Sequence, residues 1–225
     1  MAKVTGLSGN EIFCLAQKGF SAGELVVGNS VNSMGFLGSL RAGIRNMLGG
    51  EIPQVTAAIE DGRLNAFGRM SKEAKEHGAS GVAGVTGELR KFNGSTEFLF
   101  VGSCVHATPS PHGFFTSAGD AQELYCHIDA GYEPVQHVFG NIAYSMGLRG
   151  GLFGSLKTLV RGEIPEFSDV FNSTRHKALD RIVRQAIDEK ANAVVGIRTM
   201  ITPWFGTHEM LMIEGWSSSW PLAPR

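Results

Sequence analysis

The tetrapeptide Gly-Glu-Ile-Pro occurs twice in this chain, in LGGEIPQV at residues 48–55 and in VRGEIPEF at residues 160–167. The two copies are 112 residues apart. At this offset the chain aligns with itself without a gap, and roughly 25 positions between residues 11 and 101 are identical to their partners, far more than a shared composition would produce. The sequence therefore predicts a tandem duplication, in which residues 123–213 repeat residues 11–101.

The tetrapeptide itself is typical of a break between two helices. Gly50 and Gly162 suit the left-handed residue that ends a helix, and the proline three positions later suits the first turn of the next helix. The isoleucine before each proline is held out of helical geometry. We expect Glu51 and Glu163 to stabilise the start of that second helix rather than to act in catalysis, because a negative charge is favoured there.

The apolar pattern predicts six elements in each half, in the order β-β-α-α-β-β. Glycine turns and short apolar runs indicate a strand pair at each end, and helical spacing indicates two helices between them. In the first half the expected elements are strands over residues 11–17 and 24–31, helices over residues 34–50 and from Pro53 to about Glu76, and strands over residues 81–89 and 97–105. The second half repeats the pattern, so the chain is expected to be of the α+β class.

Two prolines mark the joint between the halves. Pro109 and Pro111, with serine, threonine and glycine around them, are typical of a connector rather than of a helix or strand. We expect a first domain over residues 1–107, a linker over residues 108–119 and a second domain over residues 120–225. A unit of about 90 residues has a thin core, so its sheet needs cover from the other half or from another chain.

The composition is that of a folded globular protein, with 43% hydrophobic and 18% charged residues among 225. A net charge of −1 argues against nucleic acid as a partner. No apolar run reaches the roughly 18 residues of a membrane span, and the N-terminus has no signal-peptide core. The three scattered cysteines are too few for a disulfide framework. We therefore expect a cytoplasmic protein with no membrane partner.

Two kinds of segment resemble a known family. They are the glycine-spaced stretch SMGFLGSLRAGIRNMLGGE at residues 33–51, with the helix behind it, and the strand patterns ASGVAGV at residues 79–85 and ANAVVGI at residues 191–197. These residues resemble the YbjQ family of putative heavy-metal-binding domains, over about residues 11–104 and 123–216. The resemblance implies a dodecin-like unit assembled into a ring, with a homopentamer as the family precedent. Most members have a single unit, so two copies per chain leave open a two-tiered ring and a pseudo-symmetric ring that uses both halves.

The candidate metal ligands are three cysteines and two histidines. Cys14 and Cys126 occupy equivalent positions that we expect to lie on strands, where a lone cysteine is more often a small buried hydrophobe. The segment CVHATPSPH places Cys104, His106 and His112 in a C-x-H-x5-H arrangement, which could bind zinc or copper. Solvated histidines in a linker are the simpler explanation. A soft or transition metal is thus a possible cofactor, and its identity stays open.

The candidate anion-binding residues are Arg41, Arg45, Arg149 and Lys157 on the glycine-rich helices. Repeated around a ring, they could bind a small anionic ligand, although a solvated helix face is the more common role of such charges. The glycines of these helices match neither the phosphate-loop nor the dinucleotide fingerprint.

Corresponding positions in the two halves do not share a Ser-His-Asp or Cys-His pair, which lowers the expectation of an enzyme. We therefore expect a non-enzymatic homo-oligomer, favoured as a pentamer of two-domain chains, that binds a small ligand or heavy metal or serves as an assembly scaffold. An enzyme with its site at the interface between halves or subunits is the alternative.

Overall fold

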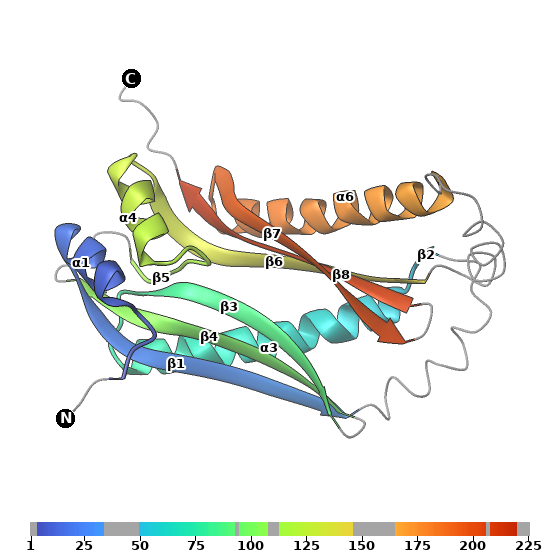
Figure 1. Cartoon of the computed structure of the whole chain (residues 1–225), viewed down its shortest axis with the longest axis horizontal. Helices are drawn as coiled ribbons and strands as arrows, with labels where there is room; N and C mark the ends of the chain where they lie inside the picture. Colours follow the sequence, from blue (N-terminus) through green and yellow to red (C-terminus); the bar gives the residue numbers. More distant parts are fainter. Residues whose placement is uncertain are drawn as a thin grey trace.

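The structure is a computed structural model that describes residues 4–33, 50–92, 95–107, 113–145, 165–205 and 208–219 (Figure 1). The elements of the first half are α1 (Gly9–Gln17), β1 (Phe20–Ser33), β2 (Gly50–Glu51), α3 (Pro53–Glu76), β3 (Gly81–Phe92) and β4 (Ser95–Ala107). They are followed by β5 (Phe115–Thr116), α4 (Ala121–Asp129), β6 (Glu133–Ser145), α6 (Pro165–Asp188), β7 (Ala193–Phe205) and β8 (His208–Ser219).

The duplication predicted from the sequence is visible in the bounds of these elements. When 112 is added to the residue numbers, α1 coincides with α4 and α3 coincides with α6, and the long strands agree to within one residue. The packing repeats as well. A Cβ at Gly28 of β1 would meet the backbone of Ala66 in α3, and a Cβ at Gly140 of β6 would meet the backbone of Ala178 in α6. Glycine at these positions lets each long helix approach its own strand closely.

The strands form two four-stranded sheets, with the orders β1-β4-β3-β5 and β2-β6-β8-β7. The three long strands of each sheet are antiparallel and come from one half. Figure 1 shows α3 along the first sheet and α6 along the second. One short strand crosses over, because β2 of the first half pairs with β6 of the second at Gly50–Ser145 and Glu51–Tyr144. The two halves are therefore joined by backbone hydrogen bonds as well as by the linker.

The strands predicted over residues 11–17 and 123–128 are wrong, because both segments are helices. Ser8 and Glu11 form a reciprocal capping box at the start of α1, and the Asp120 side chain accepts hydrogen bonds from two backbone N–H groups at the start of α4. These caps satisfy backbone donors that a helix leaves open. The turns that follow were placed correctly, since Gly19 and Gly131 have φ angles of 77° and 86°.

The second helix of each half is confirmed. Pro53 and Pro165 are the first residues of α3 and α6, and Ile52 has a non-helical conformation with φ −110° and ψ 89°. α3 ends at Glu76, where Gly78 takes a φ of 69°. The closing strand pairs are confirmed as β3 with β4 and β7 with β8. The glycine-rich helices predicted before Pro53 and Pro165 lie outside the described residues.

The linker predicted over residues 108–119 contains a short strand, so its expected lack of a regular element is wrong. Phe115 and Thr116 form β5, which pairs in parallel with Gly81 and Val82 of β3. The Phe115 side chain is buried against Phe20, with ring centroids 5.9 Å apart. The connector thus adds the short strand β5 to the first sheet, and the buried Phe115 side chain holds it there.

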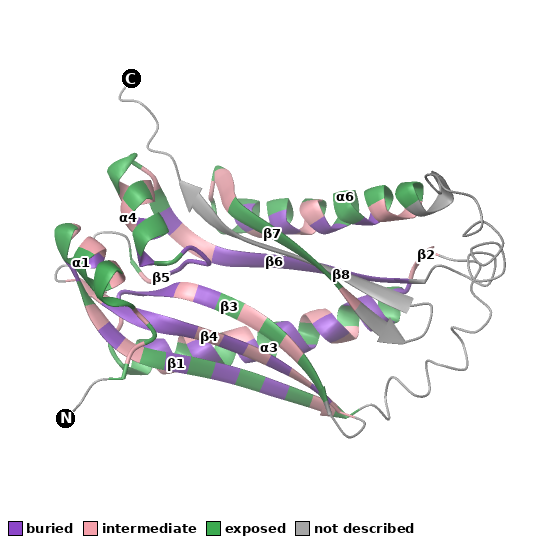
Figure 2. Cartoon of the chain, in the orientation of Figure 1, coloured by how far each residue is buried: buried purple, intermediate pink, exposed green. Residues whose placement is uncertain are grey.

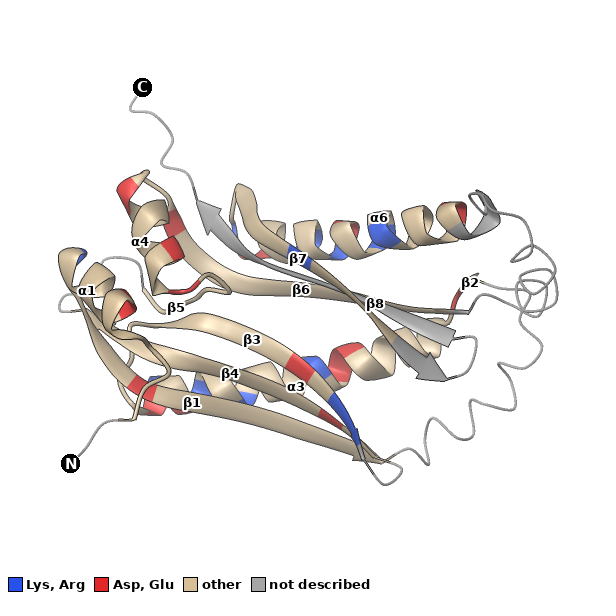
Figure 3. Cartoon of the chain, in the orientation of Figure 1, with Lys and Arg blue, Asp and Glu red and all other residues tan. Residues whose placement is uncertain are grey.

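No helix in the described part of the chain is both long and apolar enough to cross a membrane. Figure 3 shows that the long strands are largely free of charged residues and that most charges lie on the helices and near strand ends. This distribution leaves the strand faces largely uncharged, which suits them for packing against helices.

Candidate functional site

The most elaborate cluster of side chains in the described structure lies where the two halves meet. Its centre is Phe67 on α3, whose ring lies 5.5 Å from that of Phe100 in the first half and 5.8 Å from those of His137 and Phe139 on β6. Phe139 and Ala143 belong to the same hydrophobic cluster as Val26 and Phe98. The halves therefore share one core, and α3 is packed between the first sheet and β6.

A buried arginine lies over these rings. The guanidinium carbon of Arg63 is 4.3 Å from the ring centroid of Phe139 and 5.7 Å from that of Phe100. Arg63 is one helical turn before Phe67 on α3 and is buried. A guanidinium over an aromatic face gains a cation–π attraction, which is larger where water is excluded. Arg63 thus links the helix of one half to the strand of the other.

His137 is fully buried among these aromatic rings. Its backbone N–H donates to the Thr116 hydroxyl at 2.8 Å, and neither ring nitrogen has a hydrogen-bond partner among the described residues. Burial, together with the positive charge of Arg63, lowers the pKa of His137 to about 3. The imidazole is therefore neutral at physiological pH and packs as an aromatic ring.

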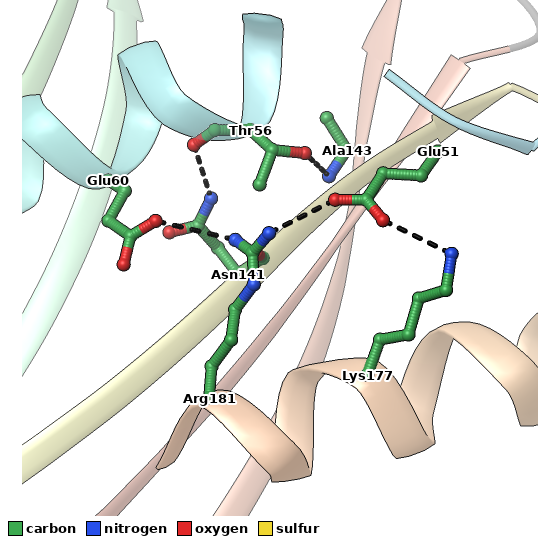
Figure 4. A network of polar contacts seen from close by, with 7 residues as sticks. All are labelled: Glu51, Thr56, Glu60, Asn141, Ala143, Lys177 and Arg181. Carbon is green, nitrogen blue, oxygen red and sulfur yellow. Dashed lines mark hydrogen bonds and ion pairs between the residues drawn. The ribbon is translucent and has the colours of Figure 1, made fainter. Parts of the chain in front are cut away.

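A polar network closes the same interface at the other end of α3 (Figure 4). Arg181 on α6 contacts Glu51 at 3.0 Å, Glu60 at 3.4 Å and the backbone carbonyl oxygen of Asn141 at 2.8 Å. Lys177, one turn earlier, contacts the second oxygen of Glu51 at 3.2 Å. In Figure 3 the acidic residue of β2 is drawn in red, and it is the residue that contacts basic side chains of α6. The network joins acidic groups of the first half to basic groups of the second.

The role predicted for Glu51 at the start of α3 is corrected by this network. The first turn of α3 has no side-chain cap, and Glu51 lies in β2 with its carboxylate directed at Arg181 and Lys177. Its counterpart Glu163 lies outside the described residues. The sequence could not reveal this role, because the partners of Glu51 come from the other half, more than 120 residues away.

Thr56 fixes the register of α3 on β6. The backbone N–H of Ala143 donates to the Thr56 hydroxyl, and the Asn141 side-chain amide donates to the Thr56 carbonyl oxygen, both at 3.0 Å. All three residues are buried. Because buried polar groups need partners, these two bonds specify one position of the helix along the strand.

A cavity of about 820 Å³ lies beside this interface. Its lining includes Phe67, Ser71, Lys72 and Lys75 from α3 and Gln136 from β6. The ammonium group of Lys75 is held 4.6 Å from the ring centroid of Phe114, and that of Lys72 lies 3.7 Å from the Glu76 carboxylate. The lining also includes the carboxylates of Glu76 and Glu189, so the wall carries charges of both signs, and the two ammonium groups are its possible contacts for a small molecule with a carboxylate or phosphate.

The structure separates the cysteines predicted as metal ligands. Cys14 is half-buried on α1 and Cys126 is exposed on α4, so both lie on helices rather than on strands. Cys104 on β4 is fully buried, and burial together with Glu24 and Glu73 raises the pKa of its thiol to about 11. A thiol that stays protonated at neutral pH is a poor metal ligand. The small buried hydrophobe expected at Cys14 and Cys126 is not found there, since Cys14 is only half-buried and Cys126 is exposed, whereas Cys104 is fully buried.

In the C-x-H-x5-H segment the structure describes one of the two histidines, His106, and this side chain contacts groups other than a cysteine. His106 lies 3.3 Å from the carbonyl oxygen of Gly78 through Nδ1 and 3.7 Å from the Glu24 carboxylate through Nε2. Within the described ranges, no group of three or more histidine, cysteine, aspartate or glutamate side chains is placed to hold a metal ion. The described donors therefore do not fit a metal centre. The remaining predicted ligands, His112, Arg41, Arg45, Arg149 and Lys157, lie outside the described residues.

Sequence reasoning missed the residues that build the interface, namely Thr56, Arg63, Phe67, His137 and Arg181. One signal was present. Two arginines of the second helix are identical at the 112-residue offset, Arg63 with Arg175 and Arg69 with Arg181, although most surface positions differ. The identity of these pairs could have marked them as structural, but their partners across the interface were not visible from the sequence.

Comparison with known proteins supports the architecture. A family described as "Putative heavy-metal-binding" (YbjQ) matches residues 18–108 and again residues 130–217. A UPF0145 protein of Methanococcus vannielii is 39% identical over 82 residues, which cover 36% of this chain and 78% of the relative. The corresponding protein of Archaeoglobus fulgidus is 37% identical over 82 residues, with 36% and 76% covered. A relative from Thermus thermophilus is 34% identical over 87 residues, with 38% and 76% covered. This chain therefore belongs to the YbjQ family of proteins described as putative heavy-metal-binding, and it contains two tandem copies of the family domain.

Proposed function

We propose that this chain is a non-enzymatic, cytoplasmic homo-oligomer that serves as an assembly scaffold, with a pentamer of two-domain chains as the favoured size. The observation that carries the proposal is the shared core, in which α3 of the first unit covers a face of β6 in the second unit. The chain thus already contains one interface between two copies of the same unit. All three cysteines are free thiols, as suits a reducing compartment.

The contacts made by the charged residues of the shared core support the proposed scaffold function. Its charged members contact one another or aromatic rings, as Arg181 does with Glu51 and Arg63 with Phe139. His137 has a pKa of about 3, so it is a poor proton donor or acceptor for catalysis near neutral pH. These residues hold two units together, and the proposal needs no reaction at the interface.

The proposal is tested by light scattering coupled to size-exclusion chromatography over a range of protein concentrations. A pentamer has about five times the chain mass of 24.1 kDa. Any stable mass that is a higher multiple of the chain mass supports assembly, and its value corrects the subunit number. A strict monomer at micromolar concentration would contradict the proposal.

An enzyme at the interface is the alternative, and the cavity beside Phe67 is the observation that favours it. Lys72 and Lys75 at its wall could bind an anionic substrate. A screen of phosphate and carboxylate compounds separates the two functions. The scaffold predicts no turnover, whereas the alternative predicts turnover that is lost in Lys72→Met and Lys75→Met and retained in the exposed-surface variant Leu64→Ala.

The description of the family names heavy-metal binding, which the described residues of this chain do not favour. The described donors do not form a metal centre, so we expect no stoichiometric metal bound through Cys14 or Cys126. Elemental analysis of protein purified without chelator checks this, with the double variant Cys14→Ala/Cys126→Ala as the comparison. Stoichiometric metal that disappears in the double variant would contradict the expectation.

A further inference from the structure

The outer face of β1 is exposed, although the equivalent face of β6 is buried. Val27 and Val31 on β1 are 44% and 51% exposed, whereas their counterparts Phe139 and Ala143 on β6 are each 2% exposed. Figure 2 shows the contrast, since β1 alternates between buried and more exposed residues, whereas β6 is buried or intermediate from Pro134 to Tyr144. The pattern extends to Leu25 and Asn29, which are exposed where His137 and Asn141 are buried.

The element that covers the face of β6 is α3 of the preceding unit, through Phe67 against His137 and Thr56 against Ala143. The counterpart of α3 in the second unit is α6. Leu179 of α6 corresponds to Phe67 and is only half-buried. Val183 and Ile187 follow at intervals of four residues, so they share its face of the helix, and they are 48% and 63% exposed. The chain thus exposes an apolar helix face as well as an apolar strand face.

The side chains along β1 are arranged as they are along β6. Arg69 donates to the Asn29 carbonyl oxygen at 2.5 Å, as Arg181 donates to that of Asn141 at 2.8 Å. The Val27 N–H donates to the Glu73 carboxylate at 2.9 Å, and the equivalent Phe139 N–H donates to the side-chain oxygen of Gln185 at 3.0 Å. These bonds join each strand to the long helix of its own unit, so β1 and β6 are held in the same way and their outer faces occupy equivalent positions.

The first helix of each half shows the same asymmetry. Leu124 on α4 is fully buried, whereas its counterpart Ile12 on α1 is exposed. In the chain, α4 packs beside α1 of the preceding unit, where Lys18 contacts Asp129 at 2.6 Å and lies 4.8 Å from the ring centroid of Tyr125. Ile12 is thus another apolar position that is exposed in the first unit and buried in the second.

We propose that a second copy of this chain places its α6 on the outer face of β1, as α3 is placed on β6 within the chain. The inference rests on the proposed self-assembly and specifies its surfaces. The acceptor surface consists of Ile12, Leu25, Val27, Asn29 and Val31, and the donor surface consists of Arg175, Leu179, Val183 and Ile187. The occupant is a second copy because the chain already joins the homologous surfaces in this way.

An interface between two different surfaces is heterologous, so it adds chains head to tail until a ring closes. Each chain then contributes both of its units to the same ring. The pseudo-symmetric ring is therefore favoured over two tiers, and the number of units around the ring is even.

The test uses two variants that each disable one surface with charges of the same sign. The acceptor variant is Val27→Glu/Val31→Glu and the donor variant is Val183→Glu/Ile187→Glu. We expect each variant alone to be a monomer of about 24.1 kDa. An equimolar mixture should form a dimer of twice that mass and nothing larger, because only one intact donor and one intact acceptor remain. The control Leu64→Glu alters an exposed apolar residue of α3 outside both surfaces and should assemble like the unmodified chain.

The alternative results are distinct. A dimer formed by either variant alone would show a symmetric interface and overturn the inference. Unchanged assembly of both variants would place the contact elsewhere, with the proposed self-assembly intact. A monomeric unmodified chain would instead refute the self-assembly itself. Circular dichroism and thermal melting confirm that each variant is folded.

A second measurement does not depend on disrupting the surfaces. Ala143 contacts Thr56 across the internal interface, and the corresponding residues between chains are Val31 and Ser168. The double variant Val31→Cys/Ser168→Cys should form disulfide-linked chains under mild oxidation, whereas either single variant should not. Absence of this difference in protein that assembles normally would contradict the inference.

Discussion

Phe67 is a residue of α3 whose ring contacts aromatic rings of both halves. Its ring contacts Phe100 of its own half and both His137 and Phe139 of the other half. Phe67 is half-buried, so its removal loses the transfer free energy of the part of the ring that packs against these partners. Phe67 is therefore a position at which one substitution affects both halves.

We expect Phe67→Ala to lower the free energy of unfolding by about 2 kcal/mol, less than the loss at a fully buried phenylalanine, because the ring is half-buried. Urea unfolding monitored by circular dichroism measures the loss. Leu64→Ala, on an exposed face of the same helix, is the matched control and should change stability by less than about 1 kcal/mol. Equal losses in the two variants would show that Phe67 is not part of a shared core.

His137 predicts a specific pH dependence. In the folded chain the pKa of His137 is lowered to about 3 from its ordinary value of 6.5. The unfolded chain therefore binds a proton that the folded chain does not bind between these values, so this stabilising contribution is complete above pH 6.5 and is lost as the pH falls toward 3. His137→Phe keeps an aromatic ring and removes the titration.

The measurement compares urea unfolding at pH 7 and pH 5 in the two proteins. The unmodified chain should lose more stability than His137→Phe over this interval, with a difference of up to about 2 kcal/mol. An identical loss in both proteins would mean that His137 titrates normally in the folded state.

At the scale of elements, the sequence was most informative where a local rule fixes the backbone. Proline at Pro53 and Pro165 located the start of each long helix, and Gly78 followed the end of α3. Glu51 shows the limit of local rules, since its position near a helix start suggested a capping role and its partners instead lie on α6. Local conformation was predictable, but pairing between distant segments was not.

The incorrect strands have a similarly local cause. Residues 11–17 and 123–128 carry apolar residues that fit a short strand or a short helix, and periodicity alone does not separate the two. The deciding residues lie just outside each segment, at Ser8 and Asp120, whose side chains cap the helices. These capping residues, and not the apolar pattern, indicate that both segments are helices.

This account predicts the effect of removing one cap. Asp120→Ala deletes two hydrogen bonds to the start of α4, from the N–H groups of Gln122 and Glu123, and should cost about 1 kcal/mol. Amide hydrogen exchange should accelerate in α4 and remain unchanged in α1. Gln122→Ala, at an exposed position of the same turn, should have little effect. Equal exchange rates in both variants would argue against the cap.

At the scale of the whole molecule, the duplication could be predicted and the arrangement of the halves could not. A repeated sequence such as the two copies of GEIP identifies residues that occupy equivalent positions in the two units. It does not report that β2 pairs with β6, or that Arg181 reaches Glu51 and Glu60. Those contacts depend on the face that each unit presents to the other, which is decided by packing. The candidate site was missed because it belongs to neither unit alone.

The shared core predicts how the chain behaves when it is divided. Residues 120–225 alone would expose Phe139 and Ala143, which α3 covers in the intact chain. We expect this fragment to aggregate or to bind a hydrophobic dye when it is produced alone. Production together with residues 1–119 should give a soluble complex of both fragments. A soluble fragment 120–225 with no dye binding would show that its core is independent of the first half.

The central claim is that the interface within the chain is repeated between chains. An experimental structure of the assembled protein tests it most directly. The account predicts that α6 of one chain lies across the face of β1 that carries Val27 and Val31 in the next chain, with Arg69 beside the contact as Arg181 is within the chain. Two β1 faces packed against each other about a two-fold axis, or a β1 face left open to solvent in the assembly, would contradict it.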